Sequence, residues 1–194
     1  MSRPFSQLCR EARACTLCED ALDAGVRPVF QADPAARILI AGQAPGLRVH
    51  RSGVPFKDAS GERLRDWMAV SESTFYDPSR IAILPMGFCY PGKGASGDLP
   101  PRPECAPTWR ADFLSAMPRI ALTLVIGQYA QQWHLESGRR SVTDVVRDWQ
   151  SVGEAVLPLP HPSPRNNIWL RKNPWFEESV VPALRERVAR ALSS

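Results

Sequence analysis

Residues 38–56 read ILIAGQAPGLRVHRSGVPF, a short apolar run that ends in glycine and leads into a loop of proline and glycine. Three more runs of this kind follow in the chain. Each is rich in Ile, Leu and Val and ends in Gly or Pro, which is typical of strands buried on both faces of a parallel sheet. The predicted strands are residues 36–42, 80–87, 120–127 and 155–160.

Helical patterns lie between and after these runs. Leu64, Trp67 and Met68 are spaced i, i+3 and i+4 in residues 60–70, after a predicted serine cap at Ser60. Strands that alternate with helices predict a doubly wound α/β sheet. The other predicted helices are residues 103–117, 127–135, 141–150 and 173–192.

The bulk composition is that of one globular domain. The chain has 194 residues, of which 44% are hydrophobic and 23% charged. We expect a single domain over residues 1–194, with an N-terminal segment at 1–35 that carries a cysteine pair and an α/β core at 36–194. We find no apolar run of membrane-spanning length and no signal-peptide pattern, and therefore expect a cytoplasmic protein. The net charge of +4 permits a nucleic-acid partner without requiring one.

The loops after the predicted strands are the candidate site, because ligands of doubly wound sheets bind beyond the carboxyl ends of the strands. GQAPG (42–46) lacks the lysine of a phosphate loop and the glycine spacing of a dinucleotide fingerprint. Taken alone, it predicts a tight turn. Phe56 follows closely enough to fold back over the strand end as a stacking platform, although GVPF (53–56) also fits a turn with a buried ring.

A second loop, HPSPRNN (161–167), is more specific, because its prolines stiffen it directly after a strand and hold His161 at the mouth of the crevice. A solitary histidine is more often a satisfied surface or core residue, but this one shares its position with the other loops. Residues 165–173 then mix basic and apolar side chains. That mixture suits phosphate contacts around a wedge between bases, or an amphipathic loop before the last helix.

The chain has five cysteines, and we expect no disulfide framework in a chain that we place in the cytoplasm. CTLC places Cys15 and Cys18 at metal-ligand spacing, and Cys89 and Cys105 flank a loop rich in proline and glycine. Two such pairs suit an iron–sulfur cluster or a structural zinc, and buried free thiols fit equally well. Cys9 is the odd one, and we expect no role for it.

These residues together resemble the uracil-DNA glycosylase superfamily over most of the chain. GQAPG with GVPF resembles its first motif and its base-stacking Phe, and HPSPRN resembles its second motif in the single-strand-selective monofunctional branch. CTLC with Cys89 and Cys105, sixteen residues apart, resembles the iron–sulfur-containing branch. The resemblance implies a three-layer α/β/α sandwich with a central four-stranded parallel sheet. It also implies a monomeric DNA repair enzyme that hydrolyses the N-glycosidic bond of uracil or another deaminated base.

The resemblance further implies roles for individual residues. The target base is flipped into the crevice and stacks on Phe56, and His161 stabilises the charge that develops on the pyrimidine O2. Gln43 and the loop backbone hold the attacking water. The implied catalytic positions are His161, Gln43 and Ala44; those at the base are Gly42, Pro45, Gly46, Phe56 and Pro85; those at DNA are Ser163, Arg165, Asn166, Asn167, Trp169, Arg171 and Lys172; and Cys15, Cys18, Cys89 and Cys105 would hold a structural 4Fe-4S cluster, with zinc as the alternative.

Two positions depart from the family pattern. Ala44 stands where several branches carry an Asp or Asn that orients water, and Pro85 stands where the iron–sulfur branch has an Asn that reads the edge of uracil. Proline has neither a side-chain hydrogen bond nor an N–H to offer. Asp58 either orients water or caps a helix, and we favour the cap. The alternative functions are a non-catalytic binder of damaged or abasic DNA on the same fold, and a thiol or metal protein in which CTLC is the functional element.

Overall fold

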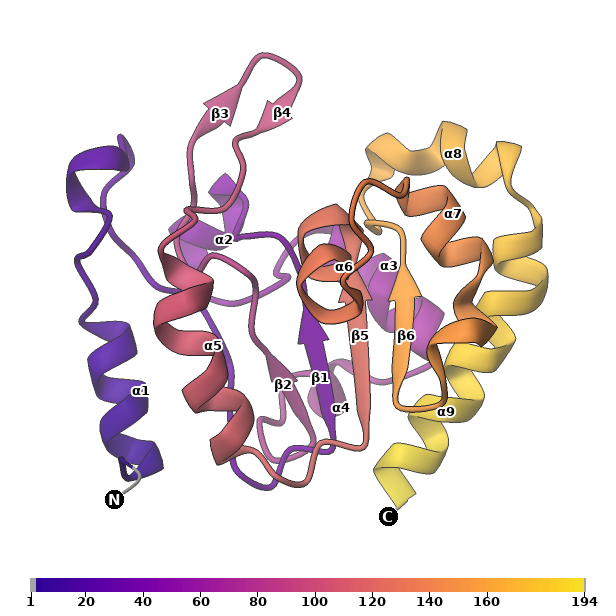
Figure 1. Ribbon diagram of the computed structural model, residues 1–194, viewed down its shortest axis with the longest axis horizontal. Helices are drawn as coiled ribbons and strands as arrows, with labels where there is room; N and C mark the ends of the chain where they lie inside the picture. The colour runs from indigo at the N-terminus through magenta and orange to yellow at the C-terminus, as the bar shows by residue number, and fades with distance from the viewer. Residues whose placement is uncertain (1–2, 194) are drawn as a thin grey trace.

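A four-stranded parallel sheet lies at the centre of the computed structural model, which describes residues 3–193 (Figure 1). Residues 1, 2 and 194 of the predicted domain lie outside the described part. The strand order is β2-β1-β5-β6, and all three pairings are parallel. The strands are β1 (Ile38–Ala41), β2 (Ile81–Ile83), β5 (Leu122–Ile126) and β6 (Val156–Leu159), each inside a predicted range, so the α/β prediction with its four-stranded parallel sheet is confirmed.

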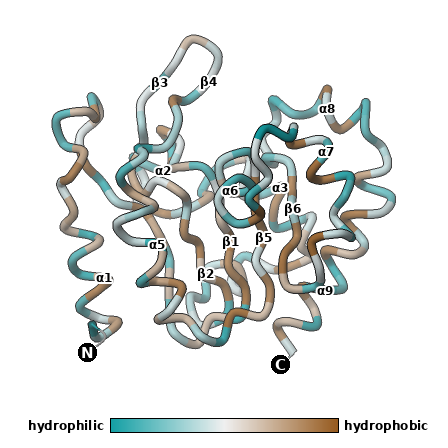
Figure 2. The backbone as a smooth tube through the Cα atoms, viewed as in Figure 1, coloured by the Kyte–Doolittle hydropathy of each residue, from teal (hydrophilic) through white to brown (hydrophobic). Residues whose placement is uncertain are grey.

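Both faces of the sheet are covered, which explains why its strands are apolar without alternation. In β1 every residue is buried. Ile38 and Ile40 belong to the core on one face, whereas Leu39 belongs to the core on the other. The hydrophobic stretches in Figure 2 accordingly run along the central strands.

On the face of Ile38 and Ile40, the sheet packs against α3 (Ala59–Met68) and α9 (Val181–Ser193). A π-helical turn, η4 (Phe176–Val180), leads into α9, and its Phe176 ring meets Trp67 of α3 edge-on at 4.9 Å. On the opposite face lie α1 (Phe5–Arg13) and α5 (Cys105–Ala116). Helices on both faces complete the three layers.

Four of the five predicted helices appear as expected: α3, α5, α6 (Gly127–Leu135) and α7 (Val142–Arg147), the last continued by η2 (Trp149–Val152). The fifth is η4 followed by α9. The predicted cap at Ser60 is wrong, because the side chain of Asp58 accepts the hydrogen bond from the Gly61 N–H, at 3.0 Å. The Asp58 cap that we favoured is therefore confirmed, and Ser60 lies inside the first turn.

Several short elements have no counterpart in the predictions. They are η1 (Glu19–Ala21), α2 (Leu47–Ser52), α4 (Glu72–Phe75), β3 (Lys93–Gly94), β4 (Gly97–Asp98), η3 (Pro164–Asn166) and α8 (Asn167–Lys172). Figure 1 shows the β3–β4 hairpin projecting beyond the carboxyl ends of the sheet strands.

No helix among residues 3–193 is both long and apolar enough to cross a membrane.

A buried arginine fixes the chain where it leaves β2. Arg110 of α5 is only 2% exposed, and its Nη1 donates to the carbonyl oxygens of Leu84 at 3.1 Å and Pro85 at 3.3 Å. Its Nε donates to Nε2 of His134 at 3.0 Å. Burial lowers the pKa of Arg110 to about 10. Burial, together with the charge of Arg110, lowers the pKa of His134 to about 4, so this imidazole is neutral.

His134 is expected to make the stability of the protein depend on pH. The unfolded chain binds a proton at this histidine near its ordinary pKa of about 6.5, whereas the folded chain does so only near pH 4. Its contribution to stability is therefore complete above about pH 6.5 and is lost as the pH falls toward 4. In His134→Gln the amide oxygen accepts from Arg110 without titrating. We expect a smaller loss of unfolding free energy between pH 7.5 and 4.5, measured by urea denaturation, with stability at pH 7.5 within about 1 kcal/mol of the wild type. Equal losses in the two proteins would contradict this assignment.

Candidate active site

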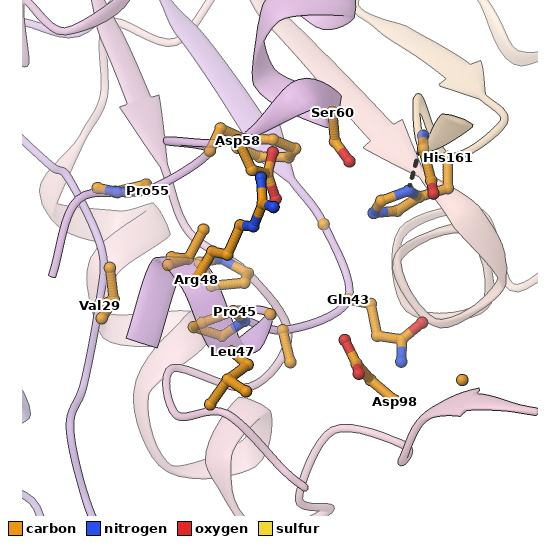
Figure 3. Close-up of a pocket in the computed structure, with 18 of the residues that line it drawn as sticks. Val29, Gln43, Pro45, Leu47, Arg48, Pro55, Asp58, Ser60, Asp98 and His161 are labelled. Atoms are coloured by element: carbon orange, nitrogen blue, oxygen red, sulfur yellow. Dashed lines mark hydrogen bonds between the residues drawn. The ribbon is translucent and has the colours of Figure 1, made fainter. Parts of the chain in front are cut away.

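A cavity of about 560 Å³ opens at the carboxyl ends of the sheet strands (Figure 3). It brings together three regions that are far apart in the sequence: the loop 42–46, Phe56 and the loop that begins at His161. Asn167, Trp169, Arg171 and Lys172 lie outside it, on α8. The predicted site residues that line it are Gly42, Gln43, Ala44, Pro45, Gly46, Phe56, Pro85, His161, Ser163, Arg165 and Asn166.

The floor of the cavity continues the sheet. The Met86 N–H donates to the Gly42 carbonyl at 2.8 Å, and the Gly87 N–H donates to the Gln43 carbonyl at 3.0 Å. Parallel pairing therefore extends beyond β1 and β2 and fixes the backbone of the loop. Nε2 of Gln43 donates to the Leu99 carbonyl at 3.1 Å, which ties the β3–β4 hairpin to the same loop.

Phe56 forms a wall over this floor. A Cβ atom added to Gly42 would lie 3.6 Å from the Phe56 ring, so the ring rests directly over the glycine. The ring also meets Phe75 edge-on at 6.2 Å. Phe56 has a φ of 53°, a left-handed conformation that costs a bulky residue of order 1 kcal/mol or more and that is often found at functional sites. A Cβ on Gly61 would come within 1.8 Å of the Phe56 carbonyl oxygen, so α3 approaches this residue as closely as only glycine permits.

His161 lies directly after β6 and is oriented by its own loop. Its Nδ1 accepts a hydrogen bond from the Ser163 N–H at 3.2 Å, so the neutral ring carries its proton on Nε2. Burial lowers the pKa of His161, and the carboxylates of Asp58 and Asp98 oppose that shift. At neutral pH this side chain is therefore an uncharged hydrogen-bond donor at the edge of the cavity.

The 161–167 loop is fixed from two directions. Nδ2 of Asn166 donates to the His161 carbonyl at 2.7 Å. Arg63 of α3 donates from Nη1 to the Ser163 carbonyl at 3.1 Å, and from Nη2 to Oδ1 of Asn167 at 2.7 Å. Arg63 is a supporting residue that the sequence analysis missed. It is about a hundred positions away from its partners, and no local pattern indicates such a contact.

Trp169 faces the body of the protein. It is half-buried, its Nε1 donates to Oγ1 of Thr143 at 2.8 Å, and its ring packs edge-on against Trp175 and Phe176. The apolar side chain that α8 exposes to solvent is Ile168, at 59% exposure. Arg171 and Lys172 are exposed at the end of the same helix.

The cavity has polar residues that the sequence analysis did not assign. Arg48 of α2 and Ser60 of α3 line it, and so does Asp98 of the hairpin. The hairpin forms one wall, because a Cβ on Gly97 would lie 3.2 Å from Nη1 of Arg165. The glycines and the lysine of segment 92–98 suggest a phosphate contact or a mobile loop, and they give no sign that a carboxylate from this segment enters the site.

The four cysteines predicted as ligands, Cys15, Cys18, Cys89 and Cys105, all line a second, smaller cavity, which lies between the N-terminal segment, residues 87–89 and the first turns of α5. Burial, with a smaller contribution from the nearby thiols, raises the pKa of Cys89 to about 11 and that of Cys105 to about 12. Such values are opposite to those of a reactive redox dithiol. Cys9 lies apart from this group, against the core beneath α1.

As they stand, the four sulfurs do not form a coordination sphere. Within residues 3–193 no three or more His, Cys, Asp or Glu side chains are arranged to hold a metal ion. The cavity of about 20 Å³ is also close to the size of a single water rather than that of a cluster. The four thiols therefore line one cavity, and their side chains would have to rearrange to bind a metal.

Comparison with protein families adds to this geometry. The family model described as Uracil DNA glycosylase superfamily matches residues 29–185. The matched region contains the 42–46 and 161–167 loops, Phe56 and the hairpin. The match to this family model does not distinguish the branches of the superfamily.

We expect Gly61→Ala to destabilise the protein strongly. The new Cβ meets the Phe56 carbonyl at 1.8 Å, so the first turn of α3 or the Phe56 backbone has to move. The unfolding free energy in urea should fall by about 2 kcal/mol or more. Glu62→Ala is the matched control, because Glu62 is exposed on the same helical turn, and the loss there should stay below about 1 kcal/mol. Equal losses in the two variants would show that the close contact has no special role.

Proposed function

The chain belongs to the uracil DNA glycosylase superfamily, and we propose that it is a monomeric, monofunctional DNA glycosylase of base excision repair. Members of the superfamily are generally N-glycosylases, so membership suggests this activity and implies DNA as the substrate. The finer proposal is that uracil or another deaminated base is flipped into the cavity and released by hydrolysis. One observation carries it: the Phe56 ring and the neutral donor of His161 line one cavity of about 560 Å³.

Stacking on Phe56 helps to hold the extruded base. Flipping costs a few kcal/mol of lost stacking and pairing, and a stack on an aromatic side chain returns about 1–3 kcal/mol. Gly42 leaves the floor beside the ring without a side chain, and the contact with Phe75 holds the ring in place. The platform is therefore formed before the base arrives.

His161 supplies the electrostatic part of catalysis. When the glycosidic bond of uracil breaks, negative charge develops on O2, the oxygen next to the glycosidic nitrogen. The Nε2–H of His161 donates to that oxygen, and a fixed donor in a partly buried site requires little reorganisation during the reaction. The lowered pKa of His161 suits this role, because the donor remains uncharged at neutral pH.

The surface around the cavity suits a phosphate backbone. Arg165 lies at its rim, and Arg171 and Lys172 lie on α8 beside it. We assign phosphate contacts to these three cations. We assign the wedge between bases to Ile168, the exposed apolar residue of α8.

The activity is tested by base release. An oligonucleotide panel with uracil, hypoxanthine, xanthine and thymine mismatches, in single and double strands, should yield free base from at least one substrate. His161→Ala should lower the single-turnover rate by about 10²–10³-fold, the effect of removing one oxyanion donor. Glu62→Ala, which is exposed and outside the cavity, should retain the wild-type rate.

The panel also tests the second candidate function. Ala44 and Pro85 remove two polar side chains from the cavity, which favours a non-catalytic binder of damaged or abasic DNA on the same fold. Salt-dependent binding that prefers a lesion, without release of any base, would support that function. No release and equal affinity for intact duplex would contradict both.

We also propose that Cys15, Cys18, Cys89 and Cys105 hold a structural 4Fe-4S cluster, with zinc as the alternative. Support comes from their common cavity and from the mutual effect of their charges on the pKa of Cys89 and Cys105. Because the raised pKa values of Cys89 and Cys105 keep these two thiols protonated without metal, binding would release protons. The centre would join the N-terminal segment to α5 and take no part in hydrolysis.

Metal analysis tests this proposal directly. Protein purified without oxygen should absorb visible light and contain about four iron atoms per chain, the content of a single cluster. Cys89→Ser should lower the iron content and the melting temperature, whereas Cys9→Ser, outside the thiol cavity, should change neither. Colourless, metal-free wild-type protein would contradict the proposal, and zinc in place of iron would change only the identity of the metal.

A further inference from the structure

The cavity lacks a carboxylate at the position where several branches of the superfamily orient water, because that position is Ala44. It nevertheless contains two carboxylates from elsewhere in the chain, Asp58 and Asp98. Both lie near enough to His161 for their charges to raise its pKa against the effect of burial. If His161 marks the glycosidic bond, either carboxylate is near the reacting atoms.

Asp58 is already engaged by the fold. Its Oδ1 accepts from the Gly61 N–H at 3.0 Å, and this bond caps α3. The cap holds the helix end beside Phe56, so Asp58 has a structural role that restricts its side chain.

Asp98 is different, because no described residue in 3–193 donates a hydrogen bond to its carboxylate or forms an ion pair with it. It is exposed to water in the absence of DNA. A carboxylate in this state is free to accept hydrogen bonds from a water molecule that the bound DNA encloses.

The chain holds Asp98 in place by its backbone. Asp98 pairs with Lys93 in the β3–β4 hairpin, and the next residue, Leu99, accepts the hydrogen bond from Nε2 of Gln43. Figure 3 shows Gln43 between His161 and Asp98. The side chain predicted to hold the water thus anchors the hairpin that carries the carboxylate.

Gly46 provides the space for this arrangement. A Cβ on Gly46 would lie 3.6 Å from Oδ2 of Asp98, so any longer side chain there would meet the carboxylate. The missing side chain at position 46 and the hairpin carboxylate therefore fit together on the same side of the cavity.

From this geometry we propose that Asp98 is the catalytic carboxylate that orients the attacking water and accepts its proton. The inference rests on the proposed glycosylase function. The water oxygen forms a bond to C1′ of the sugar while the bond from C1′ to the base nitrogen breaks, and that electron pair leaves with the base. The water's proton passes to Asp98, and the base anion, stabilised by His161, is protonated from solvent. The negative charge of Asp98 also stabilises the cationic sugar.

One pair of measurements tests the proposal and distinguishes it from the proposed function. The first is the single-turnover rate of base release. Asp98→Asn keeps the shape of the side chain and should lower the rate by about a hundredfold, within the range of general-base catalysis. Asp23→Asn, an exposed carboxylate outside the cavity, should leave it unchanged. Asp58→Asn retains a capping side chain, and a large loss there with none in Asp98→Asn would overturn the assignment.

The second measurement does not require turnover. DNA with a cationic pyrrolidine at an abasic position mimics the charged sugar, and DNA with a neutral tetrahydrofuran is its control. The wild type should bind the cationic form about tenfold more tightly, as expected for a nearby carboxylate, and Asp98→Asn should lose that preference. Melting temperatures of the two proteins should agree, since the side chain makes no hydrogen bond in the fold.

The outcomes separate cleanly. Base release that is unchanged in Asp98→Asn, together with an unchanged preference, overturns the role of Asp98 and leaves the glycosylase proposal standing. If the protein prefers the cationic pyrrolidine DNA in a way that depends on Asp98 but releases no base, the glycosylase proposal is contradicted. The placement of the Asp98 carboxylate near the sugar is then supported. Absence of both release and preference overturns both proposals.

Discussion

The hydrogen bonds from the Met86 and Gly87 N–H groups to the carbonyls of Gly42 and Gln43 set the geometry of the whole site. They extend the parallel pairing of β1 and β2 by two residues, into segments that are no longer strands. The segment that contains Gly42 and Gln43 thereby becomes a rigid cavity floor. The segment that follows β2 is held by Arg110, which donates to the carbonyls of Leu84 and Pro85. The floor and the root of the hairpin are thus parts of one hydrogen-bonded frame.

The electrostatics of the cavity follow from what this frame places around His161. Burial and the bond from the Ser163 N–H keep the ring neutral with its proton on Nε2, while two carboxylates on other elements favour the charged form. The His161 ring is therefore an uncharged hydrogen-bond donor that lies near two carboxylates, Asp58 and Asp98. In a reaction in which a base leaves as an anion and a sugar becomes cationic, a neutral donor and a separate carboxylate suit opposite ends of the breaking bond.

The sequence predicts the strands and helices whose formation depends on local burial. It does not predict features that contacts between distant residues determine. The strands were predictable as short continuous apolar runs that end in Gly or Pro, and the long helices because their apolar residues repeat at the helical period. Capping shows the limit: Ser60 and Asp58 are both good caps, and the contact of Gly61 with the Phe56 carbonyl fixes where α3 begins. Trp169 and Ile168 are both apolar, and only packing against Trp175 and Phe176 decides which one is exposed. The hairpin has strands of two residues each, too short for any periodicity.

Helix α5 links the thiol cavity to the cavity that Phe56 and His161 line. It begins at Cys105, and one and a half turns later it carries Arg110, which binds the carbonyls of Leu84 and Pro85. The chain then runs from Pro85 through Phe88, whose N–H donates to Sγ of Cys105, to Cys89. Residues 84–89 are therefore held against α5 at both ends. A metal that joins Cys89 to Cys105 would stiffen that same segment, and with it the backbone that pairs with Gly42 and Gln43, without entering the cavity that Phe56 and His161 line.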